Sequence, residues 1–334
     1  MTPGITLDRT AAPAADERGG SRPLKLVLLV AALGLLSAAP FFFYPIFLMK
    51  ILCFALFAAA FNLLLGYTGL LSFGHAAFFG GAAYVTAYTV KEWGVTPEIG
   101  VLFGVLAAAG LGLVIGALAI RRQGIYFAMI TLALSQMVFF ACLQAPFTGG
   151  EDGLQGVPRG RFLGLVDLSD PIAMYFFVAG VFLFGLFAVY RIVHSPFGTI
   201  LRSIRENETR ATSLGYSVAA YKLGAFVMSA ALAGLAGGVK ALVFQFATLT
   251  DVTWQMSGEV ILMTLLGGIG TMLGPVVGAG LVVAIQNSLA TSAFPVTVIT
   301  GLIFMVCVLL FRRGIIGEIL ASRLGRRLGG SNGG

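Results

Sequence analysis

The chain has 334 residues, of which 58% are hydrophobic and only 10% are charged, whereas about 25% are charged in an ordinary soluble domain. This composition excludes a soluble globular protein. A membrane-spanning helix needs about 20 mostly apolar residues, so the length accommodates roughly eight to ten of them. The net charge of +7 comes from short basic clusters beside apolar runs, where such residues orient the chain in a membrane. It does not indicate nucleic-acid binding. We therefore predict an all-α, polytopic integral membrane protein surrounded by lipid bilayer.

The apolar runs divide the chain into a leader, a membrane domain and a tail. Residues 1–23 are rich in Ala, Pro, Gly and charge and are predicted to be a disordered, basic cytoplasmic leader. The first apolar run is longer than the core of a signal peptide and is expected to be a retained helix. The transmembrane permease domain should occupy 24–311 and a basic cytoplasmic tail 312–334, which places both termini in the cytoplasm. Spans are predicted at 24–44, 47–65, 75–90, 99–120, 125–145, 172–190, 223–246, 259–266, 276–290 and 296–311.

Two polar loops interrupt these spans. The loop 146–171 contains the neighbouring acids Glu151 and Asp152 and is predicted to be periplasmic. These acids lack the alternation of a calcium-binding loop, so we expect a structural turn or a docking surface. The basic segment 191–222 is predicted to be cytoplasmic. Its apolar residues recur at helical spacing between residues 195 and 215, which predicts one short amphipathic helix ending at Gly215. That helix could lie on the membrane surface or dock into a partner's groove.

Two Gly-rich breaks, at 64–69 and 265–270, resemble each other. Similar breaks at corresponding positions of two halves often mark a transport pathway between repeats, although short apolar Gly-rich stretches also match by chance. The region around the first break could form either one re-entrant hairpin or two spans. His75 could act in a proton relay, but a neutral hydrogen-bonding residue that locks the break is favoured because no acidic residue is near in sequence. The pathway candidates are Asn62, Gly66, Thr68, Gly69, Ser72, His75, Gly267, Gly268 and Gly270.

The sequence contains no motif for catalysis by this chain itself. There is no GxxxxGK motif followed by Ser or Thr, no HExxH and no GxSxG. Cys53, Cys142 and Cys307 stand singly within apolar runs. We therefore predict no enzyme activity, no catalytic residues, no metal and no bound cofactor. The other polar residues in the predicted spans are expected to form hydrogen bonds between helices; they are Gln136, Glu259, Gln286 and Asn287.

Several motifs follow one another in a fixed order. They comprise a Gly-rich segment beginning at Phe61-Asn62 and containing GYTGLLSFGHAAFFG, then GIYFAM from Gly124, TGGEDGLQGVP from Thr148, SPFGTILRSIRENETRATSLG from Ser195, YKLGAF, and LLGGIGTMLGPVVGA from Leu265. Over residues 63–290 this order resembles the branched-chain amino-acid ABC transporter permeases of the LivM type.

The resemblance implies a bacterial inner-membrane importer with several other subunits. These are a second permease subunit of the same family, two cytoplasmic ATP-binding subunits that use the ATP, and a periplasmic solute-binding protein. It also implies that segment 195–215 contains the coupling helix that docks on the ATPase. The usual Glu-Ala-Ala of importers is replaced here by Thr209-Arg210-Ala211, so the role of that glutamate is not transferred. The coupling candidates are Arg202, Arg205, Glu206, Asn207, Glu208, Ala211 and Gly215.

The transported solute is left open by the motifs. Branched-chain, hydrophobic amino acids are the first interpretation, and a related importer for urea, short amides or other amino acids is the alternative. An ion-coupled secondary transporter belongs to a different class and would normally carry charged residues along its pathway. The sequence shows few of them within its spans.

Overall fold

The computed structural model describes residues 34, 36–162, 164–289, 301–302, 305, 314–316 and 318, and it divides into two compact units, Met1–Phe42 and Phe43–Gly334. In the first unit, residues 36–42 are helical. The predicted leader, most of the predicted span 24–44, most of the span 296–311 and nearly all of the tail lie outside the described residues. Helices α2 to α11 all belong to the second unit.

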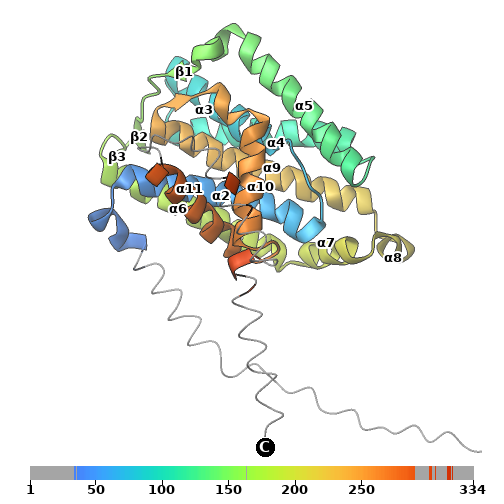
Figure 1. Cartoon of the computed structure of the whole chain (residues 1–334). Helices are drawn as coiled ribbons and strands as arrows, with labels where there is room; N and C mark the ends of the chain where they lie inside the picture. The colour runs from blue at the N-terminus through green and yellow to red at the C-terminus, as the bar shows by residue number, and fades with distance from the viewer. Residues whose placement is uncertain are drawn as a thin grey trace, which may run out of the picture. The chain divides into compact units, whose positions relative to one another are not determined.

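The second unit is built almost entirely of helices (Figure 1). Several of them begin with proline, whose fixed φ suits the first helical position and whose missing N–H is not needed there. The helices are α2 (Pro45–Thr68), α3 (His75–Glu92), α4 (Pro97–Ala119), α5 (Ile125–Gln144), α6 (Pro171–Val193), α7 (Pro196–Glu206), α8 (Glu208–Ser213), α9 (Val218–Phe244), α10 (Trp254–Gly267) and α11 (Gly274–Leu289). The all-α, polytopic fold predicted from the sequence is confirmed.

Within the described residues, α2, α4, α5, α6 and α9 are long and apolar enough to cross a membrane. Helices α3, α10 and α11 fall on predicted spans but are shorter or less apolar. The total of eight to ten spans therefore stays a prediction. Helix α10 begins at Trp254, a residue that the apolar pattern places in the preceding loop.

Helices α2 and α9 form the core. In each of them 78% of the most apolar stretch is buried, against 33% in α4, 22% in α5 and 39% in α6. The outward faces of these three peripheral helices carry large apolar side chains such as Leu106, Phe140 and Phe184, all more than half exposed. In a membrane protein such a surface faces the acyl chains of the lipid.

Small residues allow α3 and α9 to pack closely, as is typical of helices in membranes. A Cβ atom at Gly237 of α9 would lie only 1.9 Å from the carbonyl oxygen of Phe79 in α3, and one at Gly234 would lie 2.4 Å from the Cβ of Ala108 in α4. Neither clash involves the flexible end of a side chain. The glycines of α9 therefore set its separation from α3 and α4.

Replacing Gly237 with alanine is expected to force α3 away from α9. Overpacking in a well-packed core costs about 1–3 kcal/mol, and a clash with backbone should reach the upper end of that range. Thermal denaturation of the purified protein in detergent measures the effect. Gly110→Ala on α4 is the matched control, because a Cβ there meets nothing within 4 Å. Equal stability of the two variants would contradict the proposed packing.

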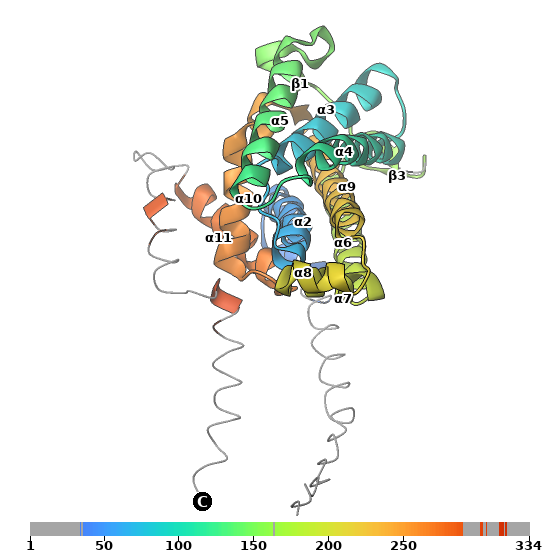
Figure 2. The same ribbon diagram turned by 90° about the vertical axis from the view of Figure 1, so that its right-hand side faces the viewer.

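The two ends of this unit are formed by different elements. Helices α7 and α8 lie at one end, and the loop after α5 lies at the other (Figure 2). That loop contains the short 3-10 helices η1 (Pro146–Thr148) and η2 (Gly150–Asp152) and strand β1 (Leu154–Gln155), which pairs antiparallel with β4 (Phe246–Ala247) after α9. A second hairpin joins β2 (Arg161–Phe162) to β3 (Val166–Asp167), and η3 (Leu249–Asp251) precedes α10.

The segment predicted as one amphipathic helix is two helices, and that prediction was wrong in this respect. The helix breaks at Asn207, whose backbone is extended and whose side-chain oxygen accepts a hydrogen bond of 2.9 Å from the N–H of Arg210. Asparagine is a favourable N-cap, so it ends α7 and begins α8. The chain then turns at Gly215, which has a positive φ of 87°.

Candidate functional site

The two Gly-rich breaks lie against each other at the ends of α2 and α10. The side-chain amide of Asn62 in α2 donates from Nδ2 to the carbonyl of Thr271, and its Oδ1 accepts from the N–H of Gly270, both at 2.9 Å. A Cβ atom at Gly66 would lie 2.8 Å from the backbone nitrogen of Gly270. One amide side chain therefore satisfies backbone groups of the second break and holds it against the first, as buried polar backbone requires.

Arg205 of α7 reaches this junction of the two breaks. Its Nη1 donates a hydrogen bond to the carbonyl oxygen of Gly66. A Cβ at Gly270 would lie 3.4 Å from that same nitrogen, and one at Gly69 would lie 3.2 Å from the Cγ of Arg205. Gly69 ends α2 with a φ of +74°, a conformation that glycine adopts without strain. The coupling candidates and the pathway candidates therefore meet at Arg205.

Other contacts fix α7 and α8 to the membrane-spanning helices. Ile204 and Ala211 are buried in one apolar cluster with Val218 at the start of α9. The carboxylate of Glu208 forms an ion pair of 2.6 Å with Lys222 of α9. Its other oxygen accepts a hydrogen bond of 2.8 Å from Gln123, which lies in the turn between α4 and α5. These contacts would therefore transmit a displacement of α7 and α8 to α2, α9 and the α4–α5 turn.

The seven coupling candidates thus have different environments. Arg205 and Glu208 are bonded to the rest of the protein, Ala211 is buried, Asn207 caps α8, and Gly215 forms a turn. Arg202 and Glu206 are exposed. Leu214, with 70% of its surface exposed, adds an apolar group to this end of the protein.

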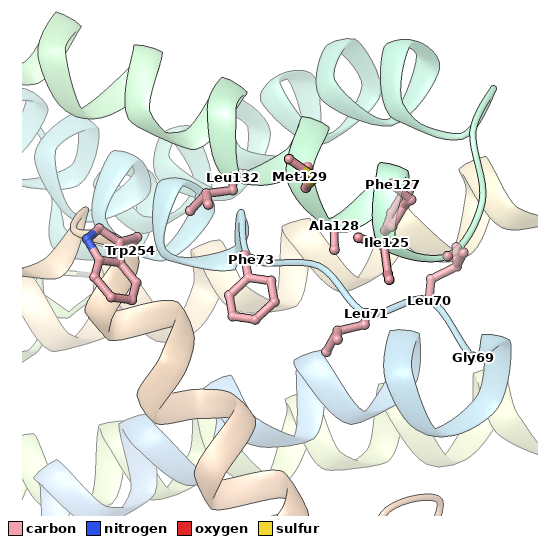
Figure 3. Close-up of a pocket in the computed structure, with 11 residues that line it drawn as sticks. Gly69, Leu70, Leu71, Phe73, Ile125, Phe127, Ala128, Met129, Leu132 and Trp254 are labelled. Carbon is pink, nitrogen blue, oxygen red and sulfur yellow. The ribbon is translucent and has the colours of Figure 1, made fainter. Parts of the chain in front are cut away.

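An apolar pocket of about 500 Å³ begins at Gly69 and runs along α5 (Figure 3). The extended segment after α2 forms one wall and is held to α5 by a hydrogen bond of 3.2 Å from the N–H of Phe73 to Thr131. Trp254, at the start of α10, lies at the opposite end of the pocket from Gly69. The pocket is lined by Gly69, Leu70, Leu71, Phe73, Gly124, Ile125, Phe127, Ala128, Met129, Leu132 and Trp254. Its lining suits an apolar side chain.

His75 lies outside this pocket and is fully buried. Its Nε2 is 2.9 Å from the hydroxyl oxygen of Ser229 in α9, and that hydroxyl donates to the carbonyl of Ala60 in α2 at 2.6 Å. The ring therefore donates its Nε2–H to Ser229. Phe61, Phe78 and Phe226 pack edge-on against the imidazole. This geometry is that of a hydrogen-bonding residue that joins α2, α3 and α9.

The remaining pathway candidates shape the backbone. The Thr68 hydroxyl donates to Leu64, and the Ser72 hydroxyl accepts from the N–H of Gly74 at 3.2 Å. A Cβ at Gly267 would lie 1.8 Å from the carbonyl oxygen of Gly274. Gly268 has a positive φ of 119° and ends α10. None of these four candidates lines the apolar pocket.

Sequence reasoning missed a buried ion pair, which lies at the end of α9 away from α7 and α8. Lys240 of α9 and Asp251 of η3 are 6% and 3% exposed, and Nζ lies 2.5 Å from the carboxylate. The rings of Phe244 and Phe246 lie 5.5 and 4.9 Å from the ammonium nitrogen. The available signal was a lysine inside a predicted span, since an intramembrane charge needs a partner.

The loop that carries Glu151 and Asp152 packs as a tight turn. A Cβ at Gly149 would lie 2.3 Å from the carbonyl oxygen of Gly153. Both acidic residues are exposed. In the same region the backbone N–H of Ser169 donates to the Asp167 carboxylate and lowers the pKa of Asp167.

The fold is that of a multi-pass helical membrane protein in which Arg205 of α7 is hydrogen-bonded to a Gly-rich break. Residues 44–312 match the family described as "Branched-chain amino acid transport system / permease component", and the chain belongs to this family. This confirms the resemblance predicted from the motifs.

Named relatives agree with this assignment. The chain is 30% identical over 250 residues to the high-affinity branched-chain amino acid transport system permease protein LivM of Escherichia coli, and 29% identical to that of Salmonella typhimurium. Each alignment covers 66% of this chain and 58% of the relative. A probable LivM of Methanocaldococcus jannaschii is 27% identical over 215 residues, which is 60% of each chain. No solved structure matches the chain.

Proposed function

We propose that this chain is the permease subunit of an ABC importer that carries branched-chain amino acids across the bacterial inner membrane. The names of its relatives supply the solute class. The proposed assembly contains a second permease of the family, two cytoplasmic ATP-binding subunits that hydrolyse ATP, and a periplasmic solute-binding protein. Helices α7 and α8 and both termini would then face the cytoplasm, in line with the basic residues of segment 191–222.

The observation that carries this proposal is the contact between Arg205 and Gly66. An importer must transmit the closure of its ATPase subunits to the membrane pathway. Helix α7 could do this, because it has exposed residues on one side and contacts the end of α2 on the other. One face of α7 buries Leu201 and Ile204, and its guanidinium holds a carbonyl at the end of α2. Displacement of α7 would pull on the junction that Asn62 forms between the two breaks. Helix ends with glycine absorb such changes in φ and ψ readily.

The apolar pocket beside this junction is the proposed route for the solute side chain. It contacts the segment that follows Gly69, so a movement of α2 relative to α5 would change its width. Specificity in this proposal resides largely in the periplasmic binding protein. The permease would need only a route that tolerates different apolar side chains, and a lining without charged residues provides it.

Uptake into vesicles that contain this chain with its co-encoded partners tests the proposal. Radiolabelled leucine should accumulate only when ATP and the binding protein are present, because the chain itself has no nucleotide-binding motif. Unlabelled valine and isoleucine should compete with leucine, whereas urea and acetamide should not. Accumulation that follows an ion gradient and ignores ATP would contradict the importer assignment. Competition by urea alone would contradict the proposed solute class.

A further inference from the structure

A polar cavity of about 670 Å³ lies next to the junction of the two breaks. Its lining residues are Gly66, Tyr67, Arg202, Arg205, Glu206 and Gly270. It differs in chemistry from the apolar pocket, because three of its six residues are charged. The three charged residues are exposed, so a solute in the surrounding water can reach the cavity.

The charged groups of this cavity form no ion pair with one another or with any other residue that the structure describes. Among the described residues, no carboxylate lies within ion-pair distance of Arg202 or Arg205, and no cation lies within that distance of Glu206. Arg205 uses Nη1 to hold the Gly66 carbonyl. A guanidinium carries five N–H donors, and the structure gives the other donors of Arg205 no acceptor among the residues that it describes. The Arg202 guanidinium lies over the ring of Tyr67, 5.4 Å from its centroid, which orients the group.

This set of groups matches the headgroup of an amino acid. Guanidinium groups bind a carboxylate through parallel, charge-assisted hydrogen bonds, and the Glu206 carboxylate with the Gly66 carbonyl can accept from an ammonium group. We infer that the cavity binds the carboxylate and ammonium groups of a free α-amino acid at the α7 end of the pathway. The inference rests on the proposed function and adds to it a binding site for the solute in the permease itself.

The position of Arg205 connects this site with the apolar route. Its side chain lines the polar cavity, and its Cγ lies 3.2 Å from the position that a Cβ of Gly69 would take. Gly69 in turn lines the apolar pocket. A solute that leaves the apolar pocket at Gly69 thus meets the two arginines and Glu206. An amino acid with an apolar side chain needs both environments, because its headgroup is costly to hold in an apolar site.

Equilibrium dialysis on the complete complex of permease and ATPase subunits, without the binding protein, tests the inference. The labelled probes are L-leucine, 4-methylpentanoate, which lacks the ammonium group, and leucinol, which lacks the carboxylate. Arg202→Met should weaken leucine and 4-methylpentanoate about tenfold, equivalent to about 1.4 kcal/mol, and leave leucinol unchanged. Glu206→Gln should weaken leucine and leucinol and leave 4-methylpentanoate unchanged. Arg191→Met, an exposed arginine at the end of α6, should change none of the three.

The crossed pattern separates binding from damage to the fold, because a distorted cavity would weaken all three probes alike. Such uniform weakening, or no effect of either variant, would overturn the inference. So would an absence of leucine binding in a complex that still imports leucine with ATP, as expected if an acidic side chain of the ATPase fills the cavity. A wild-type complex that neither imports nor binds leucine would overturn the proposed function and this inference together.

Discussion

ATP-driven uptake of leucine should fall at least about tenfold when Arg205 is replaced by methionine, while the ATPase subunits continue to hydrolyse ATP. Methionine retains most of the apolar stem that packs at Gly69 but cannot donate to the carbonyl of Gly66. A hydrogen bond from a charged donor contributes about 1.5–3 kcal/mol. Its loss corresponds to at least about a tenfold change in the equilibrium between the two positions of α2 relative to α7. Uptake and ATPase activity measured in the same proteoliposomes give the coupling ratio directly.

Two comparisons make the Arg205 prediction specific. Arg191→Met removes an exposed arginine from the same end of the protein and should leave the coupling ratio unchanged. Asn62→Leu removes the second link of the junction, and combining it with Arg205→Met should add little to the loss, because both act through one junction. Additive losses in the double variant would show that Arg205 acts elsewhere, for example on the ATPase surface.

The sequence predicted the helices well because apolar length is a strong local signal in membrane proteins. Expected spans such as 99–120 and 125–145 coincide with α4 (Pro97–Ala119) and α5 (Ile125–Gln144) within a few residues. Proline at the first position of several helices, and glycine after α2, mark boundaries by their backbone preferences. The break at Asn207 was missed because the apolar spacing continues through it, whereas the N-cap preference of asparagine overrides that spacing.

The site was only partly predictable because its central contact joins residues far apart in the chain. Asn62 and Arg205 were both singled out, but as members of separate sets, one for the pathway and one for the partner surface. Nothing in the local sequence of Arg205 shows that its guanidinium turns toward Gly66. The polar character of Ser72 and His75 is likewise used within the fold, which a reading of residue types alone does not reveal.

Removing Lys240 alone is expected to produce the largest loss of stability of any single change considered. Among the described residues, Lys240→Met leaves the buried carboxylate of Asp251 with one side-chain partner, the more distant hydroxyl of Thr248 at 3.4 Å. Breaking one side of a buried ion pair costs about 3–5 kcal/mol, because the charge that remains is uncompensated. Denaturation of the purified protein in detergent should show this loss, and Lys91→Met, at an exposed lysine of α3, should show almost none.

The double variant Lys240→Met with Asp251→Leu decides what the buried pair does. Replacing both partners by apolar groups removes the uncompensated charge, so most of the stability should return, and leucine uptake should return with it. This outcome would show that the pair has a structural role and holds the loop before α10 against α9. If stability returns and ATP-driven uptake does not, the two charges act in transport itself, and a purely structural role for the pair is wrong.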